Sequence, residues 1–304
     1  MSKVQQTDYL IIGAGAMGIA FADEIFHRDA KATIVLVDRR NKSGGHWRDA
    51  YSYVHLHQPA AFYGVNSAEL GKGTTDLSSK PEILTYYDQI MDKLLSSGRV
   101  QFFSNSNYIG DHKVVSLADE TKVTEFKVNR RLIDATHMMA EIPATHAPKY
   151  KVDDGVPLVT PNDLDKNLQG WDKYVIVGAG KTGMDAIVYL IDQGIDATKI
   201  QWIVPNDAWL WNRAMIQAGN AINEILRHVQ CIIDANNPDE VFLKLEQVGS
   251  IFRLDKNVLP TKWRCAIVST DELQKLQRVK NVVRKGRIAH ITNTEIQLAQ
   301  ETIP

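Results

Sequence analysis

A glycine-rich phrase that occurs twice constrains the fold more than any other feature of the chain. Residues 10–20 have the sequence LIIGAGAMGIA, and residues 175–186 have the sequence VIVGAGKTGMDA. In each copy a short apolar run precedes the glycines, and a run with apolar residues at helical spacing follows them. Each copy therefore predicts a strand, a tight turn and a helix, which together begin a βαβ unit.

The three glycines of the first copy have different expected roles in a turn that binds a dinucleotide. Gly13 permits the tight turn, Gly15 lets a diphosphate approach the backbone, and Gly18 lets the helix pack closely against the strand. The free N–H groups at the start of the helix, around Ala16 and Met17, are expected to bind the diphosphate.

The second predicted strand of this unit, residues 32–37, ends at Asp38. At this place a carboxylate accepts hydrogen bonds from the ribose of an adenosine. A glycine pattern alone is not specific. A strand, turn, helix, strand and acid in this order nevertheless predict a dinucleotide site rather than a purely structural turn.

The stretch that begins at Asp38 resembles the flavin-containing monooxygenase superfamily. That family follows its first glycine fingerprint with an acid, a basic residue, a short spacer and Gly-Gly-x-Trp, and residues 44–47 are GGHW. Residues 56–64, LHQPAAFYG, are similar to the segment along the flavin in plant auxin-forming members. The resemblance implies that residues 8–65 bind FAD. It adds four residues to the cofactor site: Arg39, Gly45, His46 and Trp47.

The residue types in this stretch agree with such a site. Two adjacent glycines make a loop that can approach a ligand closely. Trp47 offers a flat apolar surface for a ring system and a spare indole N–H, although an ordinary core tryptophan is the alternative. His55 and His57 would share one face of a strand, but no third ligand lies near them in the sequence. No metal site is therefore predicted.

The second copy is predicted to bind a second dinucleotide through the same kind of backbone groups. A strand over residues 173–177, a helix over 184–194 and a strand over 199–204 surround its glycines. In the resembling family the second fingerprint holds NADPH and has the form GxGxSG or GxGxTG, which Thr182 fits. The resemblance implies that NAD(P)H delivers electrons to the FAD. The predicted cofactor residues of this copy are Gly178, Gly180, Lys181, Thr182 and Gly183.

The residues after the second strand of this unit leave the choice between NADH and NADPH open. NADPH usually requires an arginine or lysine there, and NADH an acid. Residues 205–207 are Pro-Asn-Asp, and Arg213 follows a few residues later. Arg213 is a candidate ligand of the 2′-phosphate, with a solvated surface arginine as the alternative. Trp209 and Trp211 either cover the nicotinamide or pack in the interior.

The expected architecture is α/β, with two Rossmann-like dinucleotide-binding domains and the NAD(P) domain inserted into the FAD domain. Residues 1–155 form the first part of the FAD domain, and residues 156–283 form the NAD(P) domain with a partly helical insertion over 214–264. Residues 284–304 alternate like a hairpin that returns to the FAD domain. The family continues with a strand at the flavin ring, so we expect a truncated chain or a site completed in another way.

Composition narrows the expected partners. The chain has 35 basic and 36 acidic residues and a formal net charge of −1, which gives no electrostatic reason to expect a nucleic acid or an anionic membrane. Residues 9–21 are too short to span a bilayer and lack the features of a secretory leader. Cys231 and Cys265 form no CxxC pair, so reduced thiols are expected. We expect a cytoplasmic protein that acts on a small-molecule substrate. A homodimer is compatible with the sequence.

The resemblance implies a monooxygenase that acts on a small organic substrate. NAD(P)H would reduce the flavin, and the reduced flavin would react with oxygen. His57, Gln58 and Asn66 lie in the segment expected beside the flavin and are the candidate catalytic residues.

Two departures from the family pattern keep other functions open. The motif F-x-G-x-x-x-H-x-x-x-W/F is absent from residues 140–171, and His137 stands where the family has the glycine of an Ala-Thr-Gly strand end. The alternatives are a flavin reductase or diaphorase without oxygen insertion, a flavin-free NAD(P)-dependent dehydrogenase, and a non-catalytic, truncated nucleotide-binding protein.

Overall fold

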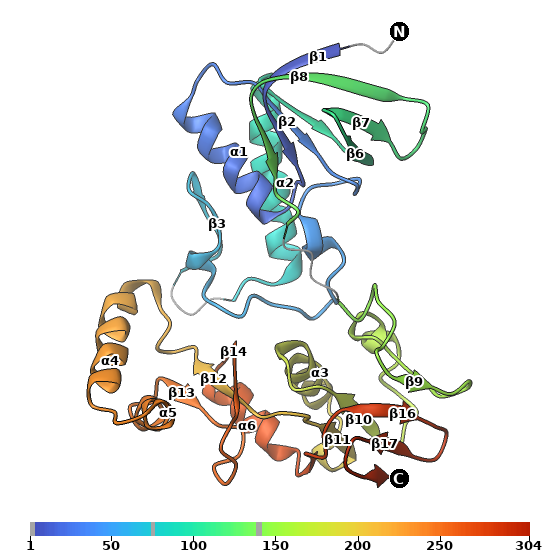
Figure 1. The fold of residues 1–304 in the computed structure, drawn as a ribbon, viewed down its shortest axis with the longest axis vertical. Coiled ribbons are helices and arrows are strands. Elements are labelled where there is room, and N and C mark those ends of the chain that lie inside the picture. Colours follow the sequence, from blue (N-terminus) through green and yellow to red (C-terminus); the bar gives the residue numbers. More distant parts are fainter. Residues whose placement is uncertain (1–3, 74–76, 138–141) are drawn as a thin grey trace. The chain divides into compact units, whose positions relative to one another are not determined.

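The computed structural model describes residues 4–73, 77–137 and 142–304 of the 304-residue chain. The described residues divide into two compact units, drawn as ribbons in Figure 1. The first unit comprises residues up to 50 together with those from 60 to 137, and the second comprises 51–59 and 142–304. Each unit has parallel strands joined by helices, which confirms the predicted pair of Rossmann-like α/β domains. None of the described helices combines the length and the apolar character that crossing a membrane requires.

The first unit is built on a six-stranded sheet with its first strand near the centre. The strand order is β5-β2-β1-β8-β7-β6, and the pairs that β1 makes with β2 and β8 are parallel. The strands and helices are β1 (Val4–Ile12), α1 (Ala16–Arg28), β2 (Ile34–Val37), α2 (Lys80–Ser96), β5 (Val100–Phe103), β6 (Ser106–Gly110), β7 (Lys113–Ser116) and β8 (Val123–Asp134).

Both faces of the central strands are covered, as their unbroken apolar runs predict. On one face Leu10 packs with Phe126 of β8 and Val114 of β7. Strand alternation turns Ile11 to the opposite face, where it is fully buried. The helices α1 and α2 contact β1 and β5. The first glycine phrase therefore lies at the end of a buried strand, held between layers.

The second unit contains a smaller parallel sheet of the same type, with the order β10-β11-β15. Trp202 of the middle strand and Leu190 of the helix that follows the first strand, β10, are fully buried in one core. The second glycine phrase thus also joins a buried strand to a helix that packs on the sheet. The elements are β10 (Tyr174–Val177), α3 (Lys181–Asp192), β11 (Ile200–Ile203), α6 (Thr270–Arg278) and β15 (Asn281–Val283).

Residues 214–264, the predicted partly helical insertion, contain two helices and parts of a second small sheet. The helices are α4 (Ala221–Ile233) and α5 (Pro238–Gln247), and the sheet consists of β13 (Ile251–Phe252), β14 (Lys262–Val268) and the preceding β12 (Ala208–Asn212). The ring of Trp209 stacks on Phe242 with centroids 5.5 Å apart, and Trp211 packs in the same cluster. Interior packing, one of the two alternatives for these tryptophans, is therefore what the structure shows.

The last three strands of the chain join β9, near residue 151, in a four-stranded sheet with the order β18-β17-β16-β9. Ile291 and Ile296 of this sheet pack with Ile203 at the end of β11. This apolar contact places residues 284–304 in the second unit, whereas the sequence analysis assigned them to the FAD domain. The strands are β9 (Lys151–Val152), β16 (Ile288–Ile291), β17 (Ile296–Leu298) and β18 (Thr302–Ile303). Short elements elsewhere are β3 (Gly64–Val65), β4 (Ala68–Glu69) and 3-10 turns at Gly45–Arg48, Ala60–Phe62, Pro161–Lys166, Ala197–Lys199 and Ala218–Asn220.

Candidate functional site

The first glycine turn has a backbone that only glycine fits at two positions. Gly13 has a φ of +98°, and a Cβ there would lie 2.9 Å from the Cγ2 atom of Thr136. A Cβ on Gly18 would lie 1.9 Å from the carbonyl oxygen of Gly13. The tight turn and the close approach of α1 to β1, both expected from the sequence, are therefore present in the structure.

The Gly44–Gly45 loop lies directly on this turn. The N–H of Gly44 donates to the carbonyl oxygen of Ala14 at 2.8 Å. A Cβ on Gly45 would come within 2.8 Å of the Cα atom of Gly15. The absent side chain of Gly15 therefore makes room for a neighbouring loop, in addition to the expected room for a diphosphate.

Asp38 ties the second strand of the unit to the glycine turn. Its Oδ2 atom accepts the N–H of Ala14 at 2.8 Å, and its Oδ1 atom accepts the N–H of Arg40 at 2.8 Å. Each carboxylate oxygen has a further lone pair, so the ribose contact stays a prediction. Arg39 is exposed, whereas Arg40, which the sequence analysis did not single out, forms an ion pair with Asp49.

The two aromatic residues of the GGHW loop lie in different surroundings. Trp47 is 7% exposed, and its indole N–H donates to the hydroxyl of Tyr63 at 2.8 Å. The expectation of a spare N–H on Trp47 is therefore wrong, because the hydroxyl of Tyr63 accepts it. The imidazole of His46 is exposed, with its centroid 5.2 Å from the Trp47 ring.

The helices that follow the two glycine turns begin without side-chain caps. α1 starts after Gly15 and α3 after Gly180, and among the described residues neither has a capping side chain or an acid in its first turn. By contrast, α5 and α6 are capped by Asn237 and Ser269. The first N–H groups of α1 and α3 are thus left for an external anion. In α1 these belong to half-buried Ala16 and exposed Met17.

The three candidate catalytic residues belong to different units, Asn66 to the first and His57 and Gln58 to the second. Asn66 donates from Nδ2 to Oε2 of Glu24 at 2.9 Å. Glu24 lies in the middle of α1, about 12 Å along the helix from Ala16 at ~1.5 Å per residue. Asn66 is therefore not brought to the diphosphate end of α1. His57 and Gln58 belong to residues 51–59, which are part of the second unit.

His57 is held through its backbone. Its carbonyl oxygen accepts the Nε–H of Arg213 at 2.9 Å. Burial, together with the charge of Lys181, holds the pKa of the His57 imidazole below its ordinary value. A neutral imidazole, able to donate and to accept one hydrogen bond, is the form expected at neutral pH.

The second glycine turn repeats the first but is more open. Gly178 has a φ of +104°, and a Cβ on Gly183 would lie 2.6 Å from the carbonyl oxygen of Gly178. A Cβ on Gly180 would meet no described atom within 4 Å, unlike the crowded Gly15 of the first unit. The space next to Gly180 is thus open to a ligand.

A network of charged groups with little exposure begins at Lys181, the first residue of the helix after the second turn. The ammonium of Lys181 contacts Asp185 and lies 3.0 Å from Glu272, whose carboxylate also binds Arg213 at 2.6 Å. The hydroxyl of Tyr51 donates to Asp185 at 2.6 Å. Burial alone would raise the pKa of Glu272, but the hydrogen bond from Arg213 and the charge of Lys181 lower it to about 2.

This network changes the interpretation of two predicted cofactor residues. Arg213 is 6% exposed, so it is not a solvated surface arginine, and Glu272 and the His57 carbonyl already hold its guanidinium. The ammonium of Lys181 is likewise held by carboxylates. Thr182 follows Lys181 in the first turn of α3, where the backbone N–H groups remain the expected ligands of a diphosphate.

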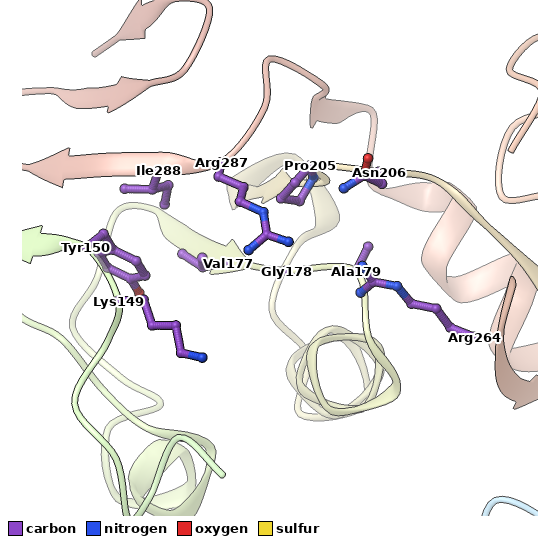
Figure 2. A pocket seen from close by; sticks show the side chains of 10 residues that line it. All are labelled: Lys149, Tyr150, Val177, Gly178, Ala179, Pro205, Asn206, Arg264, Arg287 and Ile288. Atoms are coloured by element: carbon purple, nitrogen blue, oxygen red, sulfur yellow. The ribbon is translucent and has the colours of Figure 1, made fainter. Parts of the chain in front are cut away.

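A pocket of about 390 Å³ lies at the second glycine turn (Figure 2). Residues 177–179 of the turn line it, together with Pro205 and Asn206. Arg264 and Arg287 also line it. Neither arginine could be found from the sequence, because Arg264 lies in β14 and Arg287 directly precedes β16, and no local pattern connects them with the glycine phrase.

The histidine, cysteine and acidic side chains form no candidate metal site in the part of the chain that the structure describes. Among the described residues, no cluster of three or more histidine, cysteine or acidic side chains could hold a metal ion. Cys231 is buried and Cys265 is exposed, and both are free thiols. His137 is exposed just after β8, where the preceding Ala135 donates its N–H to the carbonyl oxygen of Ile12.

Comparison with known sequences finds relatives of much greater length. No protein-family model matches the chain. Uncharacterized proteins of Mycobacterium tuberculosis (strain H37Rv) and Mycobacterium bovis are 41% identical to it over 319 residues. These alignments include 100% of this chain and 59% of each relative, so the chain spans about three fifths of their length.

Solved structures share the fold at low sequence identity. The polycyclic ketone monooxygenase from Thermothelomyces thermophila has a TM-score of 0.59 and 16% identity, over 100% of this chain and 62% of that chain. OTEMO in complex with FAD and NADP has a TM-score of 0.57 and 15% identity, over 98% and 69%. The bacillithiol disulfide reductase from Staphylococcus aureus has a TM-score of 0.56 and 10% identity, over 98% and 73%. The chain therefore has the fold of the flavin monooxygenase-like FAD/NAD(P)-binding oxidoreductases.

Proposed function

We propose that this chain is a flavoprotein oxidoreductase that binds FAD at its first glycine turn and NAD(P)H at its second. One observation carries the proposal: both helices after the glycine turns begin at a glycine, with neither a capping side chain nor an acid in the first turn. The helices α5 and α6 have capping side chains, and α4, which lacks one, has Glu224 in its first turn. An open helix N-terminus next to a glycine turn binds a diphosphate. The presence of two such sites in one chain supports the binding of two dinucleotides, and the OTEMO structure is a complex with FAD and NADP.

The residues of the first unit fit FAD. The backbone N–H groups after Gly15 would hold the diphosphate, and Asp38 would accept hydrogen bonds from the adenosine ribose. Arg39 and His46 are exposed and free to contact the cofactor from the surface side. Trp47 would support the Gly44–Gly45 loop from the interior. When bound, FAD supplies the capacity to accept a hydride and to pass electrons on.

The residues of the second unit fit NAD(P)H. The positive φ of Gly178 and the open space next to Gly180 leave the backbone accessible, and α3 begins there. Lys181 would contribute its backbone N–H, since its ammonium contacts Asp185 and Glu272. The network behind the turn holds residues 51–59 through Tyr51 and the His57 carbonyl.

Within this class we propose a monooxygenase that acts on a small organic substrate. The resemblance of residues 38–64 to flavin monooxygenases and the fold shared with a polycyclic ketone monooxygenase support it. His57 and Gln58 remain the candidate catalytic residues, with a neutral imidazole as hydrogen-bonding group. The fold shared with a disulfide reductase favours a second candidate, a reductase that inserts no oxygen.

A purified sample tests the proposal directly. We expect flavin absorbance bands after incubation with FAD and removal of the unbound cofactor, and oxidation of NADH or NADPH that depends on FAD. A folded sample that stays colourless would refute the proposal. For the monooxygenase, the hydrogen peroxide formed should fall short of the NAD(P)H consumed when a substrate from a panel is present. Peroxide equal to NAD(P)H throughout the panel, with rapid anaerobic dye reduction, would favour the reductase.

A further inference from the structure

We infer that this protein forms a homodimer in which the outward face of α4 packs against the same helix of a second copy, in antiparallel orientation. The inference goes beyond the proposed function and does not depend on it, because it rests on a helix of the 214–264 insertion and on neither glycine turn. It assigns a second copy of this chain to an apolar surface that the single chain leaves exposed.

The large aliphatic side chains of α4 are directed away from the unit to which the helix belongs. Each is between 45% and 74% exposed. These side chains, which we call the α4 stripe, belong to Ile222, Ile225, Leu226, Val229, Ile232 and Ile233. At roughly 100 Å² for each side chain the stripe exposes about 600 Å², the upper end of what monomeric proteins expose in one apolar patch. A patch of this size indicates an interaction site.

The inward side of α4 carries polar residues, so the helix is reversed relative to an ordinary surface helix. Glu224 is 5% exposed, and its carboxylate pairs with the imidazole of His228 at 2.9 Å and with the guanidinium of Arg227 at 3.6 Å. The ring of His228 lies beside Trp211, with centroids 5.1 Å apart. These contacts determine which side of α4 faces its own unit, and they thereby hold the α4 stripe outward.

The spacing of the α4 stripe is that of a surface that packs against another helix. Its residues recur at intervals of three and four, the pattern by which two paired helices interlock their side chains. One line along the stripe consists of Ile222, Leu226, Val229 and Ile233, with intervals of four, three and four. This order of intervals is the same in both directions along the helix. The stripe can therefore match a copy of itself that runs the opposite way.

A two-fold axis at the middle of the stripe would pair its residues reciprocally. Ile222 would face Ile233 of the second copy and Leu226 would face Val229, and each pair would occur twice, as in other symmetric dimers. The dipoles of antiparallel helices also attract each other. Two stripes would bury about 1,200 Å² together, which is the lower limit for a specific protein–protein interface. The area therefore suffices for a reversible dimer.

The charges beside the stripe permit self-association and disfavour an anionic lipid surface. Helical periodicity places Asn223 and Gln230 along one edge of the stripe, and both are exposed and neutral. A second copy would therefore meet no like charge along this edge. α4 contains no lysine, and its one arginine, Arg227, pairs with Glu224. A helix that lies on an anionic membrane instead has lysine and arginine on its polar face.

Sedimentation velocity of the full 304-residue chain over a range of concentrations tests this inference. We expect a reversible monomer–dimer equilibrium with a Kd on the order of 1–10 µM, because the buried area is small for a specific interface. Leu226→Glu should raise this Kd by roughly 100-fold or more, since a carboxylate would be buried against Val229 of the second copy without a partner. Leu158→Glu makes the same change at an exposed leucine outside the insertion and should leave the equilibrium unchanged.

A mixture of two variants tests the antiparallel pairing. Val229→Lys should also dissociate the dimer when it is present alone. An equimolar mixture of Leu226→Glu chains and Val229→Lys chains should form a heterodimer, because the carboxylate of one chain would face the ammonium of the other. In a parallel pair each residue would face its own counterpart, and the mixture would stay monomeric. Both side chains are exposed in the single chain, so circular dichroism should show folded variants, and Ile233→Glu at the end of α4 replaces a variant that does not fold.

Four results would overturn the inference. The first is an unmodified chain that stays monomeric up to about 100 µM. The second is a dimer that persists in Leu226→Glu and in Val229→Lys, because another surface would then join the copies. Dissociation of both variants without recovery in their mixture would exclude the antiparallel pairing. Binding of a monomeric chain to vesicles of phosphatidylcholine and phosphatidylglycerol, lost in Leu226→Glu, would show that the α4 stripe binds lipid instead.

Discussion

Gly45 lies against Gly15 so closely that a Cβ on Gly45 would come within 2.8 Å of the Gly15 Cα atom. This contact joins two motifs that lie 30 residues apart in the sequence, the glycine turn and the GGHW loop. The loop is thereby placed at the end of β1, where the diphosphate of FAD is proposed to bind.

Gly45→Ala should destabilise the first unit and weaken FAD binding. The new methyl group would collide with backbone, and alanine would have to adopt a φ of +56°. Together these effects predict a loss of about 2–4 kcal/mol in the free energy of unfolding. Urea unfolding and FAD titration measure the two effects. Gly98→Ala is the control, because Gly98 has a φ of +71° with nothing within 4 Å and should cost only about 1 kcal/mol.

Gly180→Ala should separate folding from ligand binding in the second unit. A Cβ on Gly180 meets no described atom within 4 Å, so the stability should fall by less than about 1 kcal/mol. The methyl group would project into the open space where the dinucleotide is proposed to lie, so the Kd for NAD(P)⁺ should rise by roughly tenfold. Gly183→Ala is the contrasting variant, since its Cβ would lie 2.6 Å from the Gly178 carbonyl oxygen and should impair folding itself. Unchanged binding by folded Gly180→Ala would contradict the proposed site.

Stability should depend on pH through Glu272. The pKa of Glu272 in the folded protein, about 2, lies below its ordinary value of 4.5, so the folded state favours the charged form. The resulting contribution, about 3 kcal/mol, is fully present above pH 4.5 and is lost as the pH falls toward 2. In Glu272→Gln the loss should already be present at pH 7, with a flatter profile at acid pH. Glu301→Gln removes an exposed partner of Lys285 and should leave the profile unchanged.

Arg213 should control the local stability of residues 54–58. Arg213→Ala removes the donor to the His57 carbonyl oxygen, so backbone amide exchange in this segment should accelerate. Arg213→Lys retains a positive charge near Glu272 but lacks the planar donor pair, so it should restore exchange protection only in part. Arg253→Ala breaks an ion pair with Glu246 in the same unit and should leave residues 54–58 protected. Equal exchange in all three variants would show that Arg213 does not hold the segment.

Trp47→Phe should lower stability without abolishing FAD binding. The substitution keeps an aromatic ring but removes the N–H that Tyr63 accepts at 2.8 Å, at a cost of about 1 kcal/mol. Because Trp47 is 7% exposed, the cofactor is expected to contact the loop backbone rather than the indole. A large loss of FAD affinity with unchanged stability would show instead that the indole contacts the cofactor.

The two βαβ units and their glycine turns could be predicted because their signals are local. Gly13 and Gly178 occupy backbone conformations that favour glycine, and an apolar run followed by helical spacing identifies each strand and helix. Asp38 was also placed correctly at a strand end, because the strand before it is a continuous apolar run. Such features depend on residues that are neighbours along the chain, so periodicity and residue type are sufficient to find them.

The partners of the polar side chains could not be predicted in this way. Trp47 donates to Tyr63, and Arg213 binds Glu272. Arg264 and Arg287 line one pocket. The two members of each pair lie far apart in the sequence, and no regular spacing connects them. The identity of a charged residue in the sequence does not show whether its side chain is exposed at a pocket or buried in an ion pair. Packing brings distant segments together and thereby determines which cations remain exposed at a pocket, so the two arginines that line it can be identified only in the folded chain.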